Sequence, residues 1–236
     1  MESNSSHYLE FHQRRYQFLL SVLQRVGQTQ RPFNRLLDIG LSYQTLQFQN
    51  AFPHATIDTL GYFDHRFTGQ LHGQHIHFDL NHAADPAAWP HLPPYDILVM
   101  AEVLEHLYTA PTHVLACAAS WLRPGGALIL QTPNPNSLGK RLRHLAGHSP
   151  FEIIREDPTN PGHFCEYTAA DLRLIAQQSN LELTGLWFRN YFGPRVPLYD
   201  LACTLLPGQL HDGITLLLRK PHLSEPQTAP PGSAGK

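Results

Sequence analysis

The sequence predicts an α/β fold, with an open, mostly parallel sheet and helices on both of its faces. Three neighbouring segments indicate it. Asp96 to Ala101 is a short, almost wholly apolar run without helical periodicity, as in strands buried on both faces of a parallel sheet. Residues 111–122 then keep their apolar positions on one helical face and end at Arg123-Pro124-Gly125-Gly126, and Ala127 to Gln131 is a second apolar run. Such a strand, helix and strand form a right-handed parallel unit, whose ligands bind beyond the carboxyl ends of the strands.

The composition limits the partners that we expect. The chain has 236 residues, enough for one α/β core, and only 15% of them are charged, with a formal net charge of -2. There is no basic field to hold a phosphate backbone, so no nucleic acid partner is predicted. Cys117, Cys165 and Cys203 contain no CxxC pair, which argues against a disulfide framework and a structural zinc site and favours a reducing compartment. No run approaches the roughly 18 apolar residues of a membrane span, and the amino terminus lacks a signal-like apolar region, so we expect a soluble, cytoplasmic protein.

Sixteen histidines raise the question of a metal site. His72, His75, His77 and His82 are close together in the sequence, but only His75 and His77 share a face of the strand expected there. No cysteine joins them, so we interpret them as solvated histidines and predict no metal site.

The first part of the chain predicts one helix and three strands. Tyr16, Leu19, Leu20, Leu23 and Val26 recur at helical spacing and predict a helix from His7 to about Gln28. We therefore divide the chain into a helical segment at 1–30, a catalytic domain at 31–220 and a disordered, proline-rich tail at 221–236. The three strands are expected at 35–40, 55–60 and 75–79. A short helix should follow at 85–89.

The last third of the chain predicts a lid and a sheet edge. Ser137 to about Leu145 suits a short helix that carries Lys140, Arg141 and Arg143, as a solvated face or as a site for an acidic acceptor group. The irregular residues 147–162 are expected to cover a pocket. A capping box of Thr168 and Asp171 should open a helix, and 181–188 and 214–218 should form an antiparallel pair of strands at the sheet edge.

Two motifs of the central unit resemble a known family. They read D-I-L-V-M-A-E-V-L-E-H-L and L-R-P-G-G-A-L-I-L-Q-T-P-N, and they are similar to the fourth and fifth strand motifs of class I S-adenosylmethionine (SAM)-dependent methyltransferases. The likeness is greatest to the ubiquinone-biosynthesis and sugar O-methyltransferases, and it covers about Arg35 to Phe192. It implies a Rossmann-like, mostly parallel seven-strand sheet with an antiparallel edge strand, and SAM as cofactor.

The resemblance also implies cofactor contacts at the strand ends. Asp38 and Gly40 match a glycine-rich turn, in which Ser42 and Gln44 replace two expected glycines. Gly61 occupies the usual position of a ribose-binding acid, so Asp64 is the candidate for that role. Asp79 and the amide of Leu80 would read adenine, although Asp79 also suits a turn cap. Ala101 and Glu102 would lie beside the methionine part of SAM.

The resemblance and the chemistry of hydroxyl groups together suggest O-methylation of a small molecule, a glycan or a lipid-linked precursor. His106 and His163 are the candidate bases, because an imidazole can take the proton of an acceptor hydroxyl. Glu102, Glu105, His106 and His163 also imitate the cation site of RNA-ribose 2'-O-methyltransferases, which is one alternative. A degenerate domain that keeps the fold and only binds a ligand is another.

Overall fold

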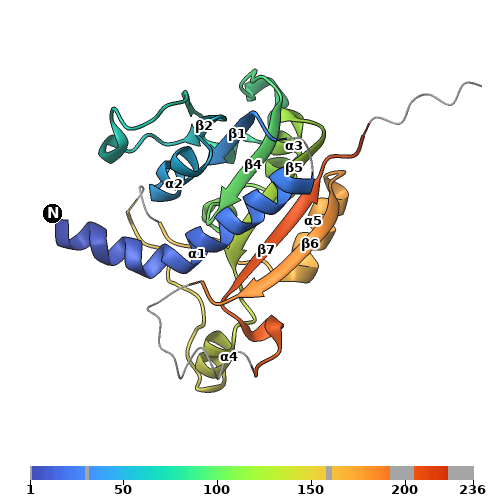
Figure 1. Ribbon diagram of the computed structural model, residues 1–236. Coiled ribbons are helices and arrows are strands. Elements are labelled where there is room, and N and C mark those ends of the chain that lie inside the picture. The colour runs from blue at the N-terminus through green and yellow to red at the C-terminus, as the bar shows by residue number, and fades with distance from the viewer. Residues whose placement is uncertain (1, 30–31, 158–160, 192–204, 223–236) are drawn as a thin grey trace, which may run out of the picture.

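The computed structural model describes residues 2–29, 32–157, 161–191 and 205–222. It contains a seven-stranded sheet with the order β3-β2-β1-β4-β5-β7-β6 (Figure 1). The strands are β1 (Arg35–Ile39), β2 (Thr56–Gly61), β3 (His75–His77), β4 (Tyr95–Ala101), β5 (Leu122–Pro133), β6 (Glu182–Arg189) and β7 (Gly213–Arg219). The helices are α1 (Glu2–Thr29), α2 (Tyr43–Ala51), α3 (Pro111–Trp121), α4 (Leu138–Leu145) and α5 (Ala169–Gln178).

The sheet confirms the predicted fold class. The first five strands pair in parallel, whereas β7 pairs antiparallel with both β5 and β6. The antiparallel strand therefore lies one place in from the edge, between β5 and the edge strand β6. This arrangement brings the carboxyl ends of β1, β2, β3 and β4 to one side of the sheet.

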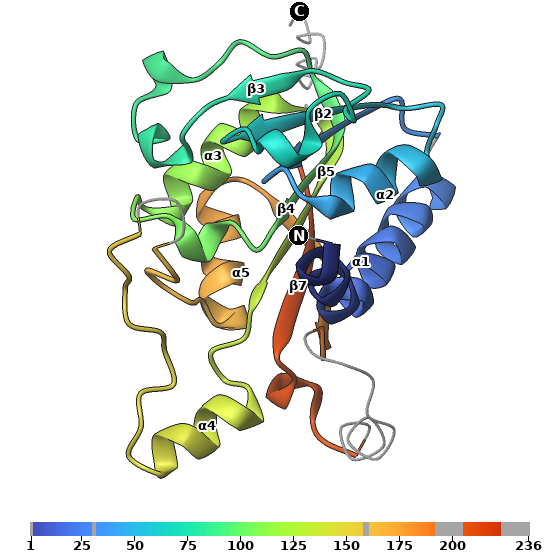
Figure 2. The ribbon, with the colours of Figure 1, turned by 90° about the vertical axis from the view of Figure 1, so that its left-hand side faces the viewer.

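Helices cover both faces of the sheet (Figure 2). On one face α1 and α2 pack on alternate strand residues such as Leu36, Val99 and Ile129. On the other face α3 and α5 pack on Leu37, Leu98 and neighbouring strand residues. Because both faces are buried, the central strands are apolar throughout, as their sequence predicted. The helix α4 stands apart from both layers.

Several predicted boundaries move. The first helix begins at Glu2 rather than His7. The segment Arg123 to Gly126 does end the preceding helix, but it already belongs to β5. Within it, Gly125 has a φ of 76°, and the pairing of β5 with β4 shifts register between Tyr95 and Ile97. Such a bulge needs glycine, so the signal that stops the helix also shapes the strand. The short helix expected at 85–89 is a single 3-10 turn at Pro86–Ala88.

The later elements agree with the sequence. The helix α4 lies at the predicted place, the capping box of Thr168 and Asp171 opens α5, and 151–157 has neither helix nor strand. Of the predicted tail, all but Pro221 and His222 lies outside the described residues. Within the described ranges, no helix is long and apolar enough to cross a membrane.

Candidate functional site

A cleft of about 620 Å³ lies at the carboxyl ends of the parallel strands. Gly40 follows β1, Gly61 ends β2, Asp79 follows β3 and Glu102 follows β4, and all four line it. The topology therefore gathers residues that are far apart in the sequence, because each follows a strand whose end lies at this side of the sheet.

The turn after β1 forms the floor of the cleft. Gly40 has a φ of 94°, and a Cβ placed there would lie 2.7 Å from Cγ2 of Val103. Ser42 has a φ of -156°, accepts a hydrogen bond from the amide of Gln44 and forms a capping box with Thr45. The serine that replaces an expected glycine thus opens α2 and needs no left-handed backbone.

Asp38 lies beneath this turn rather than in the cleft. Its carboxylate accepts hydrogen bonds from Nε2 of Gln44 at 2.9 Å and from Oγ1 of Thr45 at 2.6 Å. Burial raises the pKa of Asp38 to about 7, although the two hydrogen bonds and the charge of Arg15 oppose the rise. Gln44, at the position of another missing glycine, therefore helps to fasten β1 to α2. The predicted role of Asp38 in the cofactor site is at most indirect in this geometry.

Asp64 does not reach back into the cleft. It caps the short turn His65–Phe67 and accepts hydrogen bonds from the backbone amide of Arg66 at 2.9 Å and from its Nε at 2.8 Å. The hydrogen bonds from Arg66 outweigh burial and hold the pKa of Asp64 below its usual value. This carboxylate is committed to Arg66, so the structure corrects its placement. Gly61 and Tyr62 line the cleft at this point.

Asp79 caps a turn and lines the cleft. It caps the turn Leu80–His82 by accepting from the amide and the side chain of Asn81, at 2.9 and 3.0 Å. It also lines the cleft together with Leu80 and Asn81. Burial and the nearby Asp79 carboxylate raise the pKa of Tyr62 to about 12, so Tyr62 remains a hydrogen-bond donor beside it.

Glu102 follows β4 directly and has a strained conformation. Its φ is 56°, which is unusual for a residue with a side chain, and its amide donates to the carbonyl of Gln131 at 2.9 Å. Its Oε1 is buried and has no fixed donor among the described residues, since its neighbour is the carboxyl group of Glu105; burial raises the pKa of Glu102 against the opposing charge of Arg15. Strain and an unpaired buried oxygen are typical of functional positions. Ala101, the last residue of β4, is buried beside it and is not among the described residues that line the cleft.

A second cavity of about 900 Å³ adjoins the first. Glu102 and His106 line both, and the remaining walls come mainly from α1, α4 and the segments 150–152 and 163–166, with Pro133 of β5 and Asp212. The site thus has two compartments that meet at a carboxylate and an imidazole.

Arg15 of α1 is a residue of the second cavity that sequence reasoning missed. Its side chain is 3% exposed, and its Nε and Nη1 have no hydrogen-bond partner among the described residues. Its charge acts on both Asp38 and Glu102. The signal was present, because Arg15 lies at helical spacing from Leu19 and Val26 on the apolar face of the helix.

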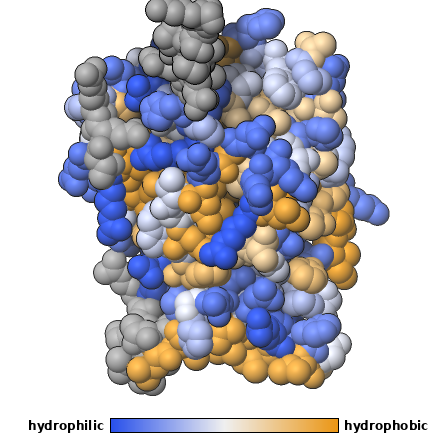
Figure 3. Space-filling view, turned by 90° about the vertical axis from the view of Figure 1, so that its right-hand side faces the viewer, coloured by the Kyte–Doolittle hydropathy of each residue, from blue (hydrophilic) through white to orange (hydrophobic). Residues whose placement is uncertain are grey.

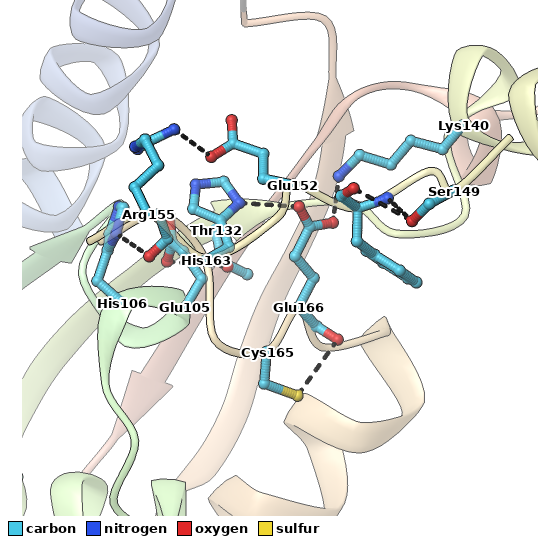
Figure 4. A network of polar contacts seen from close by, with 12 residues as sticks. Glu105, His106, Thr132, Lys140, Ser149, Glu152, Arg155, His163, Cys165 and Glu166 are labelled. Carbon is cyan, nitrogen blue, oxygen red and sulfur yellow. Dashed lines mark hydrogen bonds and ion pairs between the residues drawn. The ribbon is translucent and has the colours of Figure 1, made fainter. Parts of the chain in front are cut away.

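The predicted bases, His106 and His163, lie side by side (Figure 4), with ring centroids 4.8 Å apart at 81°. Nδ1 of His106 is 2.9 Å from the carbonyl oxygen of Gly162, which can only accept, so Nδ1 carries the proton and Nε2 is left as an acceptor. Burial lowers the pKa of His106, which favours this neutral form. The amide of Phe164 donates to the carbonyl of Glu105 at 2.8 Å, so backbone contacts hold the two histidine segments together.

Glu166 orients His163. Its Oε1 is 2.9 Å from Nδ1 of His163, and its Oε2 pairs with Lys140 of α4 (Figure 4). Burial alone would raise the pKa of Glu166, but the hydrogen bonds from His163 and Lys140 outweigh it and hold the pKa below its usual value. The resulting carboxylate accepts a hydrogen bond from Nδ1–H of His163, which leaves Nε2 as the ring nitrogen without a proton.

Glu105 lies behind the histidines. It is fully buried, Thr132 donates to its Oε2 at 3.2 Å, and its Oε1 has no partner among the described residues. Burial and the neighbouring Glu102 raise the pKa of Glu105 well above its usual value. One ligand atom from each of Glu105, His106 and His163 lies within 4.8 Å of the others. The structure thus brings together three of the four residues that the sequence offered as an alternative cation site, Glu102 being the fourth.

A family model described as "Methyltransferase domain" matches residues 11–186. No curated protein sequence matches the chain. Among solved structures, the chain is similar to a SAM-dependent methyltransferase from Archaeoglobus fulgidus, with a TM-score of 0.56, 15% identity, and coverage of 87% of this chain and 94% of that one. It is similar to a methyltransferase of the same description from Clostridium acetobutylicum, with a TM-score of 0.58, 12% identity, and coverage of 93% and 99%.

A third similar structure is the N-methyltransferase NodS from Bradyrhizobium japonicum, solved in complex with S-adenosyl-l-homocysteine. Its TM-score is 0.53 at 14% identity, and the match covers 87% of each chain. At these identities the likeness concerns the fold.

Proposed function

The chain belongs to the methyltransferase domain family, and from this premise we propose that it transfers a methyl group from SAM to an oxygen of a small molecule or of a glycan or lipid-linked precursor. The observation that carries the proposal is the meeting of two compartments at Glu102 and His106, a cleft at the strand ends and a cavity on its far side. One compartment suits the methyl donor and the other the acceptor.

The residues of the cleft fit SAM. Gly40 lines the cleft without a side chain, and Val103 packs where its Cβ would stand, so a ligand in the cleft can approach the backbone after β1 closely. Asp79 and the amide of Leu80 would hold adenine, and Gly61 and Tyr62 lie where the ribose would be read. The methionine end carries an ammonium, which would meet the buried Oε1 of Glu102, and a carboxylate, which would reach past Glu102 to the guanidinium of Arg15 in the wall of the second cavity.

The histidines supply the base that a hydroxyl acceptor requires. When bound, SAM supplies a methyl group on a positively charged sulfur, so the protein mainly has to align the acceptor and exclude water. His163 takes the acceptor proton at Nε2, because Glu166 holds its Nδ1 proton and stabilises the imidazolium that forms. His106, whose Nδ1 donates to the carbonyl of Gly162, offers its Nε2 as a second proton acceptor in the same wall of the cavity. The acceptor would be met in the cytoplasm, in which free cysteines such as Cys117 and Cys165 remain reduced.

The cluster of Glu105, His106 and His163 favours a second candidate, in which a divalent cation assists O-methylation of a ribose or another diol. A carboxylate and two imidazoles are ligands that Mn²⁺ and similar ions accept. A bound cation would polarise the acceptor hydroxyl, and the histidines would act as ligands instead of bases. Activity that is unchanged by a strong chelator would eliminate this version.

Mass spectrometry of metabolite mixtures incubated with purified protein and SAM tests the proposal. We expect a product heavier by one methyl group, formed by the wild type and much reduced in His163→Ala and His106→Ala. His113→Ala, on α3, is the matched control and should keep the activity. If the wild type binds SAM but forms no methylated product from any acceptor class, the binding-only alternative takes the place of this proposal.

A further inference from the structure

The helix α4 and the residues around it carry apolar side chains on the protein surface. We call residues 135–154 the α4 hairpin, since residues 147–151 line one groove together with α4, which is labelled in Figure 1. Its exposed large hydrophobic residues are Leu142 (56% exposed), Leu145 (83%), Phe151 (47%), Ile153 (88%) and Ile154 (44%). Hydrophobic side chains gather along the end of the molecule at which α4 lies (Figure 3). An exposed apolar surface of this extent usually marks an interaction site.

Basic side chains accompany these apolar ones. A groove of about 770 Å³ in the hairpin is lined by Lys140, Arg141, His144 and His148, next to Leu145 and Phe151, and no carboxylate occurs among the described residues that line it. The surface therefore offers positive charge and apolar area together.

The nearby acids do not face this groove. Glu152 pairs with Arg155 at 3.0 Å and lines the second cavity, and Glu166 pairs with Lys140. On α4 itself, Nε of Arg141 donates to the carbonyl of Asn136, and Arg143 to that of Ser149, so neither guanidinium is neutralised by a described carboxylate. Arg141, in the groove, thus keeps its charge available for a partner, whereas Arg143 lines the second cavity.

We propose that the α4 hairpin docks the protein on the surface of a lipid bilayer that contains anionic phospholipids. Leu142 and Leu145 enter the boundary between headgroups and acyl chains, while Arg141 contacts lipid phosphates. A short, cationic and amphipathic helix matches this interface through charge and apolar area together. Docking is peripheral, because α4 has only eight residues.

Docking has a consequence for the acceptor, and this consequence rests on the function proposed above. Lys140, Pro150 and Phe151 line both the groove and the second cavity. A docked protein therefore holds that cavity beside the bilayer, and acceptors with an apolar anchor reach the histidines without leaving it.

Flotation with vesicles of phosphatidylcholine alone, or of phosphatidylcholine with a minor fraction of phosphatidylglycerol, tests the proposal on the full chain. The wild type should float with the anionic vesicles, bind the neutral ones at least tenfold less and dissociate as salt is raised. Leu142→Ser/Leu145→Ser and Arg141→Glu should each lower partitioning at least tenfold. The matched control is Arg173→Glu/Leu174→Ser on α5, in which Leu174 is 55% exposed, and it should float like the wild type.

Two outcomes overturn the proposal: partitioning of the α4 variants equal to that of the wild type, or no binding of the wild type to anionic vesicles. In the second case, a wild-type dimer that Leu142→Ser/Leu145→Ser converts to a monomer would show that the face binds protein instead of lipid. Circular dichroism spectra and SAM binding of each variant identify any that fail to fold. Flotation requires no methyl transfer, so its failure would leave the proposed activity standing.

Discussion

Asp38→Asn should change how the stability of the protein depends on pH. The carboxyl group is fully buried, and its pKa rises from 3.8 to about 7, with burial as the largest cause. The folded state therefore holds a proton between pH 4 and 7 that the unfolded state has released, so wild-type stability falls as pH rises through this range. The free energy of unfolding falls by about 1.4 kcal/mol for each pH unit in which only the folded state is protonated. The wild type therefore loses roughly 3 kcal/mol of stability between pH 5 and 8.

Asparagine has the shape of the protonated acid and does not titrate, so the variant avoids this loss. Between pH 5 and pH 8, the free energy of unfolding of Asp38→Asn, measured by chemical denaturation, should rise relative to that of the wild type by about 3 kcal/mol. The same change corresponds to roughly 5 to 10 °C in Tm. Asp85→Asn, at an exposed cap that asparagine can maintain, is the control for the substitution itself. Parallel stability curves for Asp38→Asn and the wild type would refute the assignment of a protonated carboxyl beneath the β1 turn.

Two further predictions follow from the geometry of the site. Gly40→Ala should destabilise the protein by about 1 to 3 kcal/mol and abolish SAM binding, because the new Cβ would lie 2.7 Å from Val103 on a left-handed backbone. Gly69→Ala is the control: its φ of 73° gives the same backbone strain, but no atom lies within 4 Å of the new Cβ. Arg15→Met should weaken SAM binding at least tenfold in calorimetric titration, since it removes the cation beside Glu102, whereas the exposed Arg25→Met should bind like the wild type. Retained SAM binding in Gly40→Ala or Arg15→Met would contradict the placement of the cofactor.

The sequence predicted the fold well because the fold depends on periodicity. Apolar runs such as 96–101 and the stripe of α1 report burial directly, and the capping box at Thr168 reports a helix start. The boundaries that moved depend on tertiary contacts. The register shift at the start of β5 is one example, since a strand and a helix stop both use the same glycines.

The candidate site was harder to predict because a side chain's partners lie far away in sequence. The positions of Asp79 and Glu102 after their strands were sufficient to place them in the cleft. Asp64 was misplaced because Arg66, two residues later, captures its carboxylate. Asp38 is held away from the cleft by hydrogen bonds from Gln44 and Thr45. Arg15 lies in a helix more than twenty residues before the end of the first strand, yet its side chain lines the second cavity.

Calorimetric titration with SAM tests the central claim most directly, which is that the strand ends form a cradle for this nucleoside. We predict saturable binding at one site, and a weakening by about 1 to 3 kcal/mol in Asp79→Ala, the cost of an unsatisfied hydrogen bond in a buried site. Unchanged affinity in Asp79→Ala would remove the adenine assignment. Neither heat nor a thermal shift of the wild type at about millimolar SAM would contradict the account as a whole.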